Sequence, residues 1–290
     1  MRLATIKLEG KEQAAIVVQK GMIAIDQLNA VYKTSWKTSV YDLLINEQCE
    51  LLDEWISHLS DEQLASLDAI PFNRVEYAPL YRHPRKICGI GMNYWKKAED
   101  LGAVPPAQEP IVFFKPDTSL IGHQETIIIP QGLEQVTAEA ELGIIIGKAC
   151  KNVNEQDAMC VVAGVVPTLD MTAQDIHARN PRFLGRSKVM DTFFSFGPQL
   201  LTLNEFPSLA ELSIVTKLNG EAIHHNTVSH MIYNIPFIVS YFSEMMTLQP
   251  GDIIMTGTPG SVRIQAGNIA ACYISGVEEL INPVRNQTSY

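Results

Sequence analysis

Residues 137–146 read Thr-Ala-Glu-Ala-Glu-Leu-Gly-Ile-Ile-Ile, and residues 161–170 read Val-Val-Ala-Gly-Val-Val-Pro-Thr-Leu-Asp. Both stretches are strongly apolar and rich in branched side chains, which predicts two buried β-strands. Glu139 and Glu141 interrupt the first run, and Asp170 ends the second. Because side chains alternate along a strand, Glu139 and Glu141 should project from the same face.

These three carboxylates predict a site for a hard cation. Two carboxylates on a half-buried strand repel each other unless a cation or a proton lies between them. With Asp170 added, the set is all oxygen, which is the kind of set that Mg²⁺ prefers. Two simpler interpretations stay open: Glu139 and Glu141 could lie on the solvated face of an edge strand, and Asp170 could cap a turn.

Strand signals also dominate the flanking sequence. Short apolar runs bounded by turn residues predict strands at 86–92, 111–115, 126–130, 199–202, 212–219, 252–256 and 269–275. Two helices are predicted in this part of the chain, near 154–160 and over 236–246. Because strands and helices do not alternate regularly, the body should be an α+β, β-rich fold rather than a nucleotide-binding sheet.

The beginning of the chain predicts a smaller unit. Apolar runs at 3–8, 14–19 and 21–26 predict an antiparallel meander, and helical spacing of apolar residues predicts a helix over 41–59. Between residues 61 and 85 the pattern weakens and prolines punctuate the chain, which is typical of a linker. The chain therefore divides into a small N-terminal α+β domain at 1–80 and a main domain at 81–290.

Composition restricts the class of partner. The 290 residues are 46% hydrophobic and 19% charged, so the chain can bury a core and is not disordered. The formal net charge of -10 argues against a nucleic acid or an anionic membrane as the partner. Without a signal-peptide pattern or a membrane-spanning apolar run, a cytoplasmic protein is expected. The five cysteines include no C-x-x-C pair, so neither a disulfide framework nor a zinc-thiolate site is indicated.

A pair of glycines, Gly89 and Gly91, invites a dinucleotide-binding interpretation. The fingerprint for such a site needs a third glycine, and that position holds Tyr94. The glycine pair therefore gives little support to a Rossmann fold.

Seven short motifs follow one another along the main domain. They are Lys86-Ile-Cys-Gly-Ile-Gly-Met-Asn-Tyr94, Phe113-Phe-Lys-Pro116, Ala138-Glu-Ala-Glu-Leu142, Leu169-Asp-Met-Thr-Ala-Gln-Asp175, Lys188-Val-Met-Asp-Thr192, Met245-Met-Thr-Leu-Gln-Pro-Gly-Asp-Ile253 and Thr256-Gly-Thr-Pro259. Their order and spacing resemble those of the fumarylacetoacetate hydrolase (FAH) family, from about residue 85 to Val284. The N-terminal segment resembles the smaller domain that many bacterial members carry.

The resemblance implies a mixed β-roll fold, a homodimer and a bound Mg²⁺, Mn²⁺ or Ca²⁺. The family's metal ligands match Glu139, Glu141 and Asp170, the carboxylates that the strand pattern brings together. Lys188 matches the family's site lysine and would act as a catalytic residue by placing a charge near the substrate. Without the resemblance, Lys188 would be taken as an ordinary surface lysine.

Three further positions are expected to bind substrate: Lys115, Gln174 and Thr258. Lys115 ends a predicted strand, where a structural salt bridge is an equal alternative. Thr258 lies in a turn that could present hydroxyl and N–H groups to a carboxylate, or could be a plain tight turn. Gln174 stands where the family often has arginine, which removes a charge for a second carboxylate.

Two other positions depart from the family pattern and bear on the reaction. Many members carry a His and a Glu that activate water, and the matching positions here are Lys97 and Asp100. An ordinary lysine stays protonated and accepts no proton. Both residues are still placed among the catalytic candidates.

The resemblance implies a metal-stabilised enolate formed from a small anionic 2-oxo or diketo acid. The preferred reaction is hydrolysis of a C–C bond in an acylpyruvate or a compound similar to fumarylacetoacetate. The alternatives are decarboxylation or keto–enol isomerisation, with substrates of the oxaloacetate or 2-hydroxyhepta-2,4-diene-1,7-dioate type. A metal-binding family member with impaired catalysis and a purely structural oligomer also stay open.

Overall fold

The computed structural model of the chain describes residues 1–95 and 109–288. Its large sheet has thirteen described strands: β1 (Arg2–Leu8), β2 (Lys11–Val18), β3 (Gly21–Ala24), β4 (Tyr77–Ala78), β5 (Ile87–Gly91), β6 (Ile111–Lys115), β7 (Leu120–Ile121), β9 (Val136–Ile146), β10 (Val162–Ala173), β11 (Phe194–Phe196), β12 (Gln199–Leu201), β15 (Ile253–Met255) and β16 (Ser261–Ile264). A second sheet contains β8 (Ile127–Ile129), β13 (Ser213–Leu218), β14 (Glu221–Thr227), β17 (Ile269–Ile274) and β18 (Leu280–Asn286). The predicted α+β, β-rich fold class is confirmed.

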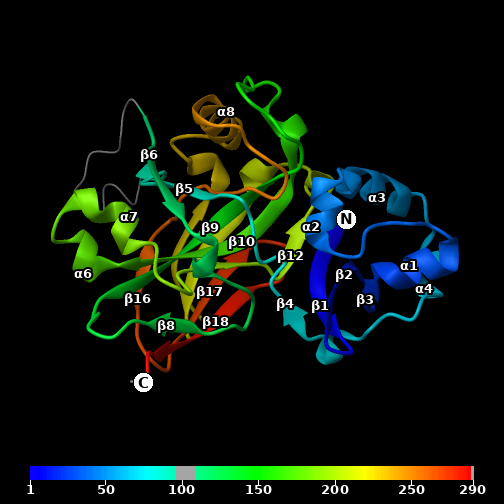
Figure 1. Cartoon of the computed structure of the whole chain (residues 1–290), viewed down its shortest axis with the longest axis horizontal. Helices are drawn as coiled ribbons and strands as arrows, with labels where there is room; N and C mark the ends of the chain where they lie inside the picture. The colour runs from blue at the N-terminus through cyan, green and yellow to red at the C-terminus, as the bar shows by residue number, and fades with distance from the viewer. Residues whose placement is uncertain (96–108, 289–290) are drawn as a thin grey trace.

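The two longest strands, β9 and β10, lie side by side in the middle of the large sheet (Figure 1). Its main path runs β3-β2-β1-β12-β10-β9-β15-β5-β6. β9 and β10 pair antiparallel along nearly their whole length, with one irregularity between Val162 and Gly164. Both strands are almost entirely buried, as expected for long runs of branched apolar residues.

The main hydrophobic core lies between the two sheets. Ala140 and Leu142 of β9, Leu169 of β10, Ile214 of β13 and Cys272 of β17 belong to one buried cluster. β13 and β14 form the predicted hairpin, in which Asn219 and Gly220 both have positive φ.

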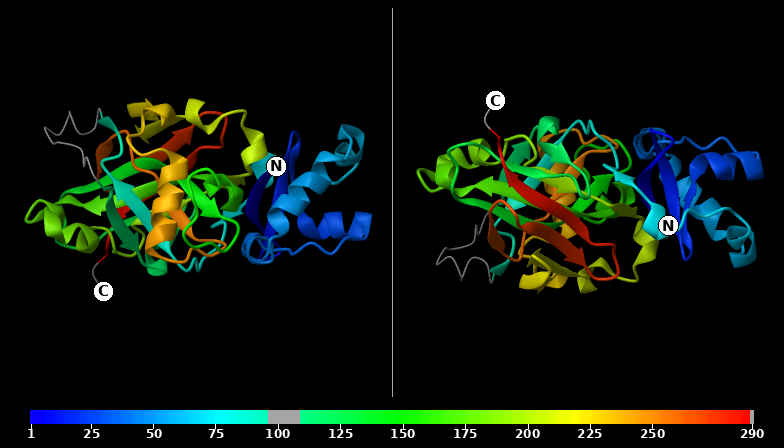
Figure 2. Two further views of the ribbon diagram at one scale, coloured as in Figure 1. Left: turned by 90° about the horizontal axis from the view of Figure 1, so that it is seen from above. Right: turned by 90° about the horizontal axis from the view of Figure 1, so that it is seen from below.

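The described helices are α1 (Ile25–Tyr32), α2 (Val40–Ile45), α3 (Gln48–Ser57), α4 (Asp61–Ala65), α6 (Gln174–His177), α7 (Leu184–Ser187) and α8 (Ile235–Met245). Figure 2 shows α8 lying across the large sheet, and the predicted helix over 236–246 is confirmed by it. The helix predicted near 154–160 is wrong, since these residues form turns and a short 3₁₀ helix at Ala158–Val161. No described helix has the length and apolar character needed to cross a membrane.

Residues 1–80, the segment predicted as a separate domain and called the N-terminal module below, lie at one end of the long axis of the molecule (Figure 1). Its meander β1–β3 is confirmed, but the single helix predicted over 41–59 is two helices, α2 and α3. Glu47 between them adopts left-handed backbone angles, with φ 54°, which turns the chain. β1 also pairs with β12, so the large sheet continues from the module into the rest of the chain.

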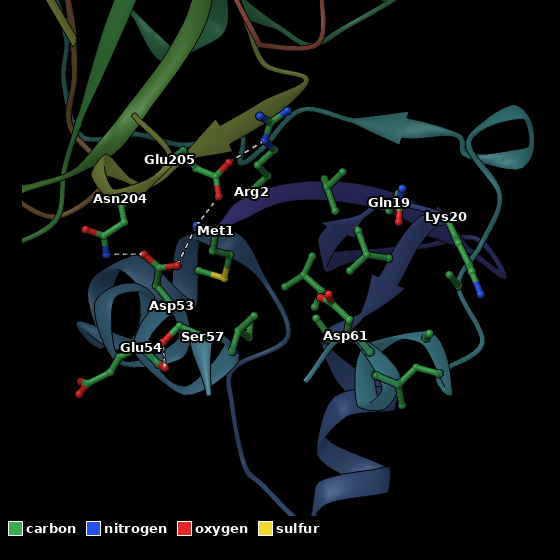
Figure 3. A pocket seen from close by; sticks show the side chains of 18 of the residues that line it. Met1, Arg2, Gln19, Lys20, Asp53, Glu54, Ser57, Asp61, Asn204 and Glu205 are labelled. Atoms are coloured by element: carbon green, nitrogen blue, oxygen red, sulfur yellow. Dashed lines mark hydrogen bonds and ion pairs between the residues drawn. The ribbon is translucent and has the colours of Figure 1, made fainter. Parts of the chain in front are cut away.

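A pocket of about 820 Å³ lies in the N-terminal module where it meets Asn204 and Glu205 (Figure 3). Within it the α-ammonium group of Met1 is 2.7 Å from Asp53 Oδ1 and 2.8 Å from Glu205 Oε1. None of the three predicted metal-binding carboxylates lines this pocket, so the candidate chemistry lies elsewhere.

Candidate metal centre

β9 and β10 bring the three predicted carboxylates onto one face of the sheet. Asp170 of β10 lies directly opposite Glu139 of β9, and Glu141 lies opposite Thr168. The side chains are buried, with Glu139 7%, Glu141 1% and Asp170 0% exposed, and one ligand oxygen of each lies within 4.8 Å of the others. The solvated edge-strand interpretation is wrong, because β9 pairs with β10 on one side and with β15 and β16 on the other.

Lys188 closes one side of this carboxylate cluster. It follows α7, and its Nζ pairs with Asp170 Oδ2 and lies 3.5 Å from Glu139 Oε2. Nζ also donates to Thr172 Oγ1 at 2.8 Å and lies 4.3 Å from the centroid of the Phe113 ring. The predicted site lysine is therefore buried against the carboxylates and is no surface residue.

A second lysine, Lys115 at the end of β6, lies on the other side of Asp170. Its Nζ is 2.8 Å from Asp170 Oδ1 and donates to the backbone carbonyls of Met171, Lys188 and Phe193 at 3.1, 2.7 and 2.8 Å. The side chain is fully buried. Because an ammonium group has three N–H donors, the three carbonyls already use its capacity, and Asp170 Oδ1 is held by the charge alone.

The two lysines have opposite pKa shifts. Burial alone would lower the pKa of Lys188, but the charges of Asp170 and Glu139 outweigh it and raise the pKa above its ordinary value. Burial lowers the pKa of Lys115 to about 8, against the opposing charge of Asp170. The carboxylates around Lys188 therefore favour its protonated, positively charged form.

The loop between β15 and β16 crosses β9 at Glu141. Gly257 N donates to Glu141 Oε2 at 2.6 Å, which is a charge-assisted bond that fixes one carboxylate oxygen. The hydroxyl of Thr258 donates to Gly260 O and accepts from Gly260 N. The Thr258 side chain thus shapes the loop, and the Gly257 N–H of the loop faces Glu141.

Thr216 is a site residue that the sequence did not reveal. Its fully buried hydroxyl accepts from Ala140 N at 3.2 Å and donates to Gly260 O at 2.9 Å. Ala140 lies between Glu139 and Glu141, so this hydroxyl joins the strand of the ligands to the loop. This contact depends on how β13 of the second sheet packs against β9, which a sequence alone does not supply.

Asn93 and Tyr94 follow β5, and neither was predicted as a site residue. Asn93 Nδ2 donates to the carbonyls of Thr256 and Tyr233 at 2.8 and 3.0 Å, which anchors the same loop from the other side. Tyr94 is fully buried, and burial together with the charge of Glu141 raises the pKa of its hydroxyl.

The remaining predicted residues lie at the rim or outside the described residues. Gln174 begins α6, four residues beyond Asp170, and its Nε2 is 3.3 Å from Thr137 Oγ1. Lys97 and Asp100 lie outside the described residues.

The donor set fits a divalent cation. Three buried carboxylates in one cluster carry more negative charge than Lys115 and Lys188 together balance. Hard oxygen donors suit Mg²⁺, Mn²⁺ or Ca²⁺, and the backbone of β9 and β10 already holds the three residues in place.

Residues 86–285 match the family described as "Fumarylacetoacetate (FAA) hydrolase C-terminal". The chain belongs to this family. The match begins close to the end of the N-terminal module and includes all three carboxylates, Lys115 and Lys188. The resemblance expected from the seven motifs is confirmed.

Relatives of known name differ in their reactions. The chain is 31% identical to human mitochondrial oxaloacetate tautomerase FAHD2B over 229 residues, which is 76% of this chain and 73% of that protein. The fold is similar to maleylpyruvate hydrolase from Sphingobium sp. SYK-6 in complex with manganese(II) and pyruvate, with 27% identity, TM-score 0.81, and 99% and 100% of the two chains covered. It is also similar to 5-carboxymethyl-2-hydroxymuconate delta-isomerase from Mycobacterium smegmatis, with 25% identity, TM-score 0.76 and full coverage of both chains.

Proposed function

We propose that the protein is a divalent-cation-dependent enzyme that acts on a small 2-oxo acid through an enolate. The observation that carries this proposal is the buried cluster of Glu139, Glu141 and Asp170, with the ammonium group of Lys188 against it. When bound there, a divalent cation would act as a Lewis acid and stabilise negative charge on the oxygens of a chelated oxo acid. We expect Mg²⁺ or Mn²⁺, with Ca²⁺ as an alternative.

The charges of the cluster support an anionic substrate. The three carboxylates outnumber the two ammonium groups of Lys115 and Lys188 by one formal charge. Two positive charges from a cation would reverse that sign, so that an acidic protein could bind a carboxylate in this place.

The residues of the chain would divide the remaining work. Lys188, held protonated by Asp170 and Glu139, would donate to the developing enolate oxygen. The loop that Asn93 and Thr216 anchor would hold Glu141 in place through the Gly257 N–H and present Thr258 to the substrate carboxylate. Gln174 at the rim would offer an uncharged amide to the far end of the substrate.

Among reactions that use an enolate, we favour keto–enol tautomerisation of a 2-oxo acid such as oxaloacetate. The described part of the cluster supplies charge stabilisation and a proton donor, and the usual water-activating His and Glu are Lys97 and Asp100 in this sequence. Tautomerisation moves one proton between a carbon and an oxygen of the substrate, and solvent water can take up the leaving proton, so no water has to attack the substrate as it does in hydrolysis. The relative named an oxaloacetate tautomerase is consistent with this choice.

Hydrolysis of a C–C bond in a diketo acid, the reaction preferred from the sequence, is the second candidate. It is supported by the fold similarity to a maleylpyruvate hydrolase crystallised with manganese(II) and pyruvate. Decarboxylation would use the same enolate. A homodimer and a cytoplasmic location remain expectations, which sedimentation and cell fractionation would test.

The test is a turnover screen of the purified protein with oxaloacetate and short acylpyruvates. We expect loss of the enol absorbance of oxaloacetate to be accelerated with Mg²⁺ or Mn²⁺, to stop with a chelator, and to return on adding the metal. Glu141→Gln should remove this activity, whereas the exposed control Glu155→Gln should retain it. Acylpyruvate cleavage without tautomerisation would select hydrolysis, and full activity of Glu141→Gln would contradict the metal mechanism.

A further inference from the structure

Two side chains on one face of β6 contact Lys188, one at its ammonium group and the other at its backbone carbonyl. Phe113 and Lys115 are two residues apart and buried, whereas Phe114 between them is exposed. The Phe113 ring lies beneath the Lys188 ammonium group, 4.3 Å from its Nζ, and Lys115 Nζ donates to the Lys188 carbonyl at 2.7 Å. A short strand therefore supports the main chain and the side chain of the same residue.

Lys115 also ties Lys188 to the carboxylate that it faces. The two oxygens of Asp170 are divided between the lysines, with Oδ1 2.8 Å from Lys115 Nζ and Oδ2 against Lys188 Nζ. The carbonyls of Met171 and Phe193 take further Lys115 donors, so β10 and the segment before β11 are held at the same point. With three carbonyl acceptors for its three N–H groups, Lys115 has no donor left for a substrate.

Gly89 on the neighbouring strand makes room for this arrangement. It pairs with Phe113 across β5 and β6, and a Cβ atom at Gly89 would overlap the end of the Phe113 ring. Gly91 lies two residues further along β5 and has more room. A Cβ atom there would lie 3.8 Å from the nearest side-chain carbon of Ile111, which is an ordinary contact. Neither glycine has a positive φ, so alanine causes no backbone strain at either position. The two substitutions differ mainly in the room available for the added Cβ atom.

We propose that Phe113 and Lys115 are positioning residues that fix the ammonium group of Lys188 against Asp170, and that Gly89 is required for this by leaving space for the Phe113 ring. Lys115 then acts through Lys188 and Asp170 and does not touch the substrate. The kinetic consequence rests on the proposed function, whereas the positioning itself does not.

The first test measures the position of Lys188 without any activity. The purified chain with Mg²⁺ is treated with an amine-reactive N-hydroxysuccinimide ester, and labelling of individual lysines is followed by peptide mass spectrometry. Lys188 should label slowly in the unchanged protein and several-fold faster in Gly89→Ala and Phe113→Leu. Gly91→Ala should leave its rate unchanged, with the exposed Lys11 as the internal reference.

Unchanged labelling of Lys188 in Gly89→Ala and Phe113→Leu would overturn the positioning role. An equal rise at Lys188 and at the buried Lys115 would also overturn it, because that pattern reports general loosening. Thermal unfolding of each variant shows whether it is folded under the labelling conditions. This readout stands even if no substrate is turned over, in which case only the proposed function fails.

The second test is a double-mutant cycle on turnover. Lys115→Gln and Lys188→Met should each lower kcat by about 10- to 100-fold with little change in KM, since misplacing a catalytic group has costs of that order. The double variant should be no slower than Lys188→Met alone, because Lys115 acts only by positioning Lys188 and has no effect once the Lys188 ammonium group is gone. Independent, multiplying losses, or a raised KM with unchanged kcat in Lys115→Gln, would instead show that Lys115 contacts the substrate.

Discussion

Thr216 shows how one buried hydroxyl can join two parts of a site. Its oxygen is bonded to Ala140 N, between the two glutamates, and to Gly260 O in the loop. We predict that Thr216→Val, which keeps the shape, lowers the free energy of unfolding by roughly 1–3 kcal/mol, because the Ala140 N–H loses this partner. Denaturant unfolding would measure it, with the exposed Thr118→Val as a control that should change little. Equal stability of the two variants would contradict the bridging role.

His123 predicts a pH dependence of stability. It is 7% exposed, and burial lowers its pKa to about 4, while its Nδ1 accepts from Ile281 N at 3.3 Å. Below the ordinary histidine pKa of about 6.5 the unfolded chain binds a proton that the folded chain does not, so stability falls as the pH falls from 6.5 towards 4.

We expect His123 to account for about 2–3 kcal/mol of that loss. His123→Asn keeps an acceptor and does not titrate, so denaturant unfolding at pH 7 and pH 4 should show a smaller loss in this variant. The same loss in both proteins would rule out His123 as its source.

At the residue level, site residues could be predicted from the sequence where their position follows from the pattern of a single strand. Glu139 and Glu141 follow from alternation, and Asp170 from its place at the end of an apolar run. Thr216 and the three carbonyl acceptors of Lys115 were not predictable, because they depend on contacts between segments that are far apart in the sequence.

The loop between β15 and β16 is the element that shapes the site around Glu141. Gly257 has φ +93°, and a Cβ atom there would lie 2.7 Å from Asn93 Cβ. Gly257→Ala should therefore destabilise the protein by about 1–2 kcal/mol from backbone strain alone, and further through this overlap.

Gly267→Ala is the matched control for the loop, since it has φ +90° and open space. Thermal unfolding should show a larger loss for Gly257→Ala, and only that variant should lose Mn²⁺-dependent turnover. Equal losses in the two variants would show that the contact with Asn93 is unimportant.

Helices and strands with a local signal in the sequence were predicted correctly, and the break between α2 and α3, which has none, was missed. The strands of the body and α8 were predicted because apolar runs and a proline at a helix start are local signals. The break between α2 and α3 was not, because Glu47 is an unusual residue for left-handed angles and its neighbours continue the helical spacing.

At the scale of the molecule, the N-terminal module and the body share one core. Leu3, Ile16 and Leu52 belong to the same buried cluster as Val166 and Met255, and β1 pairs with β12. The division at residue 80 remains a prediction from the sequence. The shared core leads us to expect a single cooperative unfolding transition.

A Trp95→Phe variant makes this testable, because the fluorescence of Trp36 and Trp55 then reports the module, while far-ultraviolet circular dichroism reports the helices and strands of the whole chain. The two midpoints should coincide. Leu3 is fully buried, so Leu3→Ala should lower the free energy of unfolding by about 2–5 kcal/mol and shift both midpoints together. The exposed Val31→Ala should change neither midpoint much. Two separate transitions would instead support independent domains.

The central claim is that Glu139, Glu141 and Asp170 hold a divalent cation. Calorimetric titration of Mn²⁺ into chelator-treated protein tests it most directly, with Glu141→Gln and the exposed control Glu155→Gln measured in parallel. We predict one saturable site per chain in the unchanged protein and in the control, and a severe loss of binding in Glu141→Gln. No saturable binding to the unchanged protein, or equal binding by Glu141→Gln, would contradict the account.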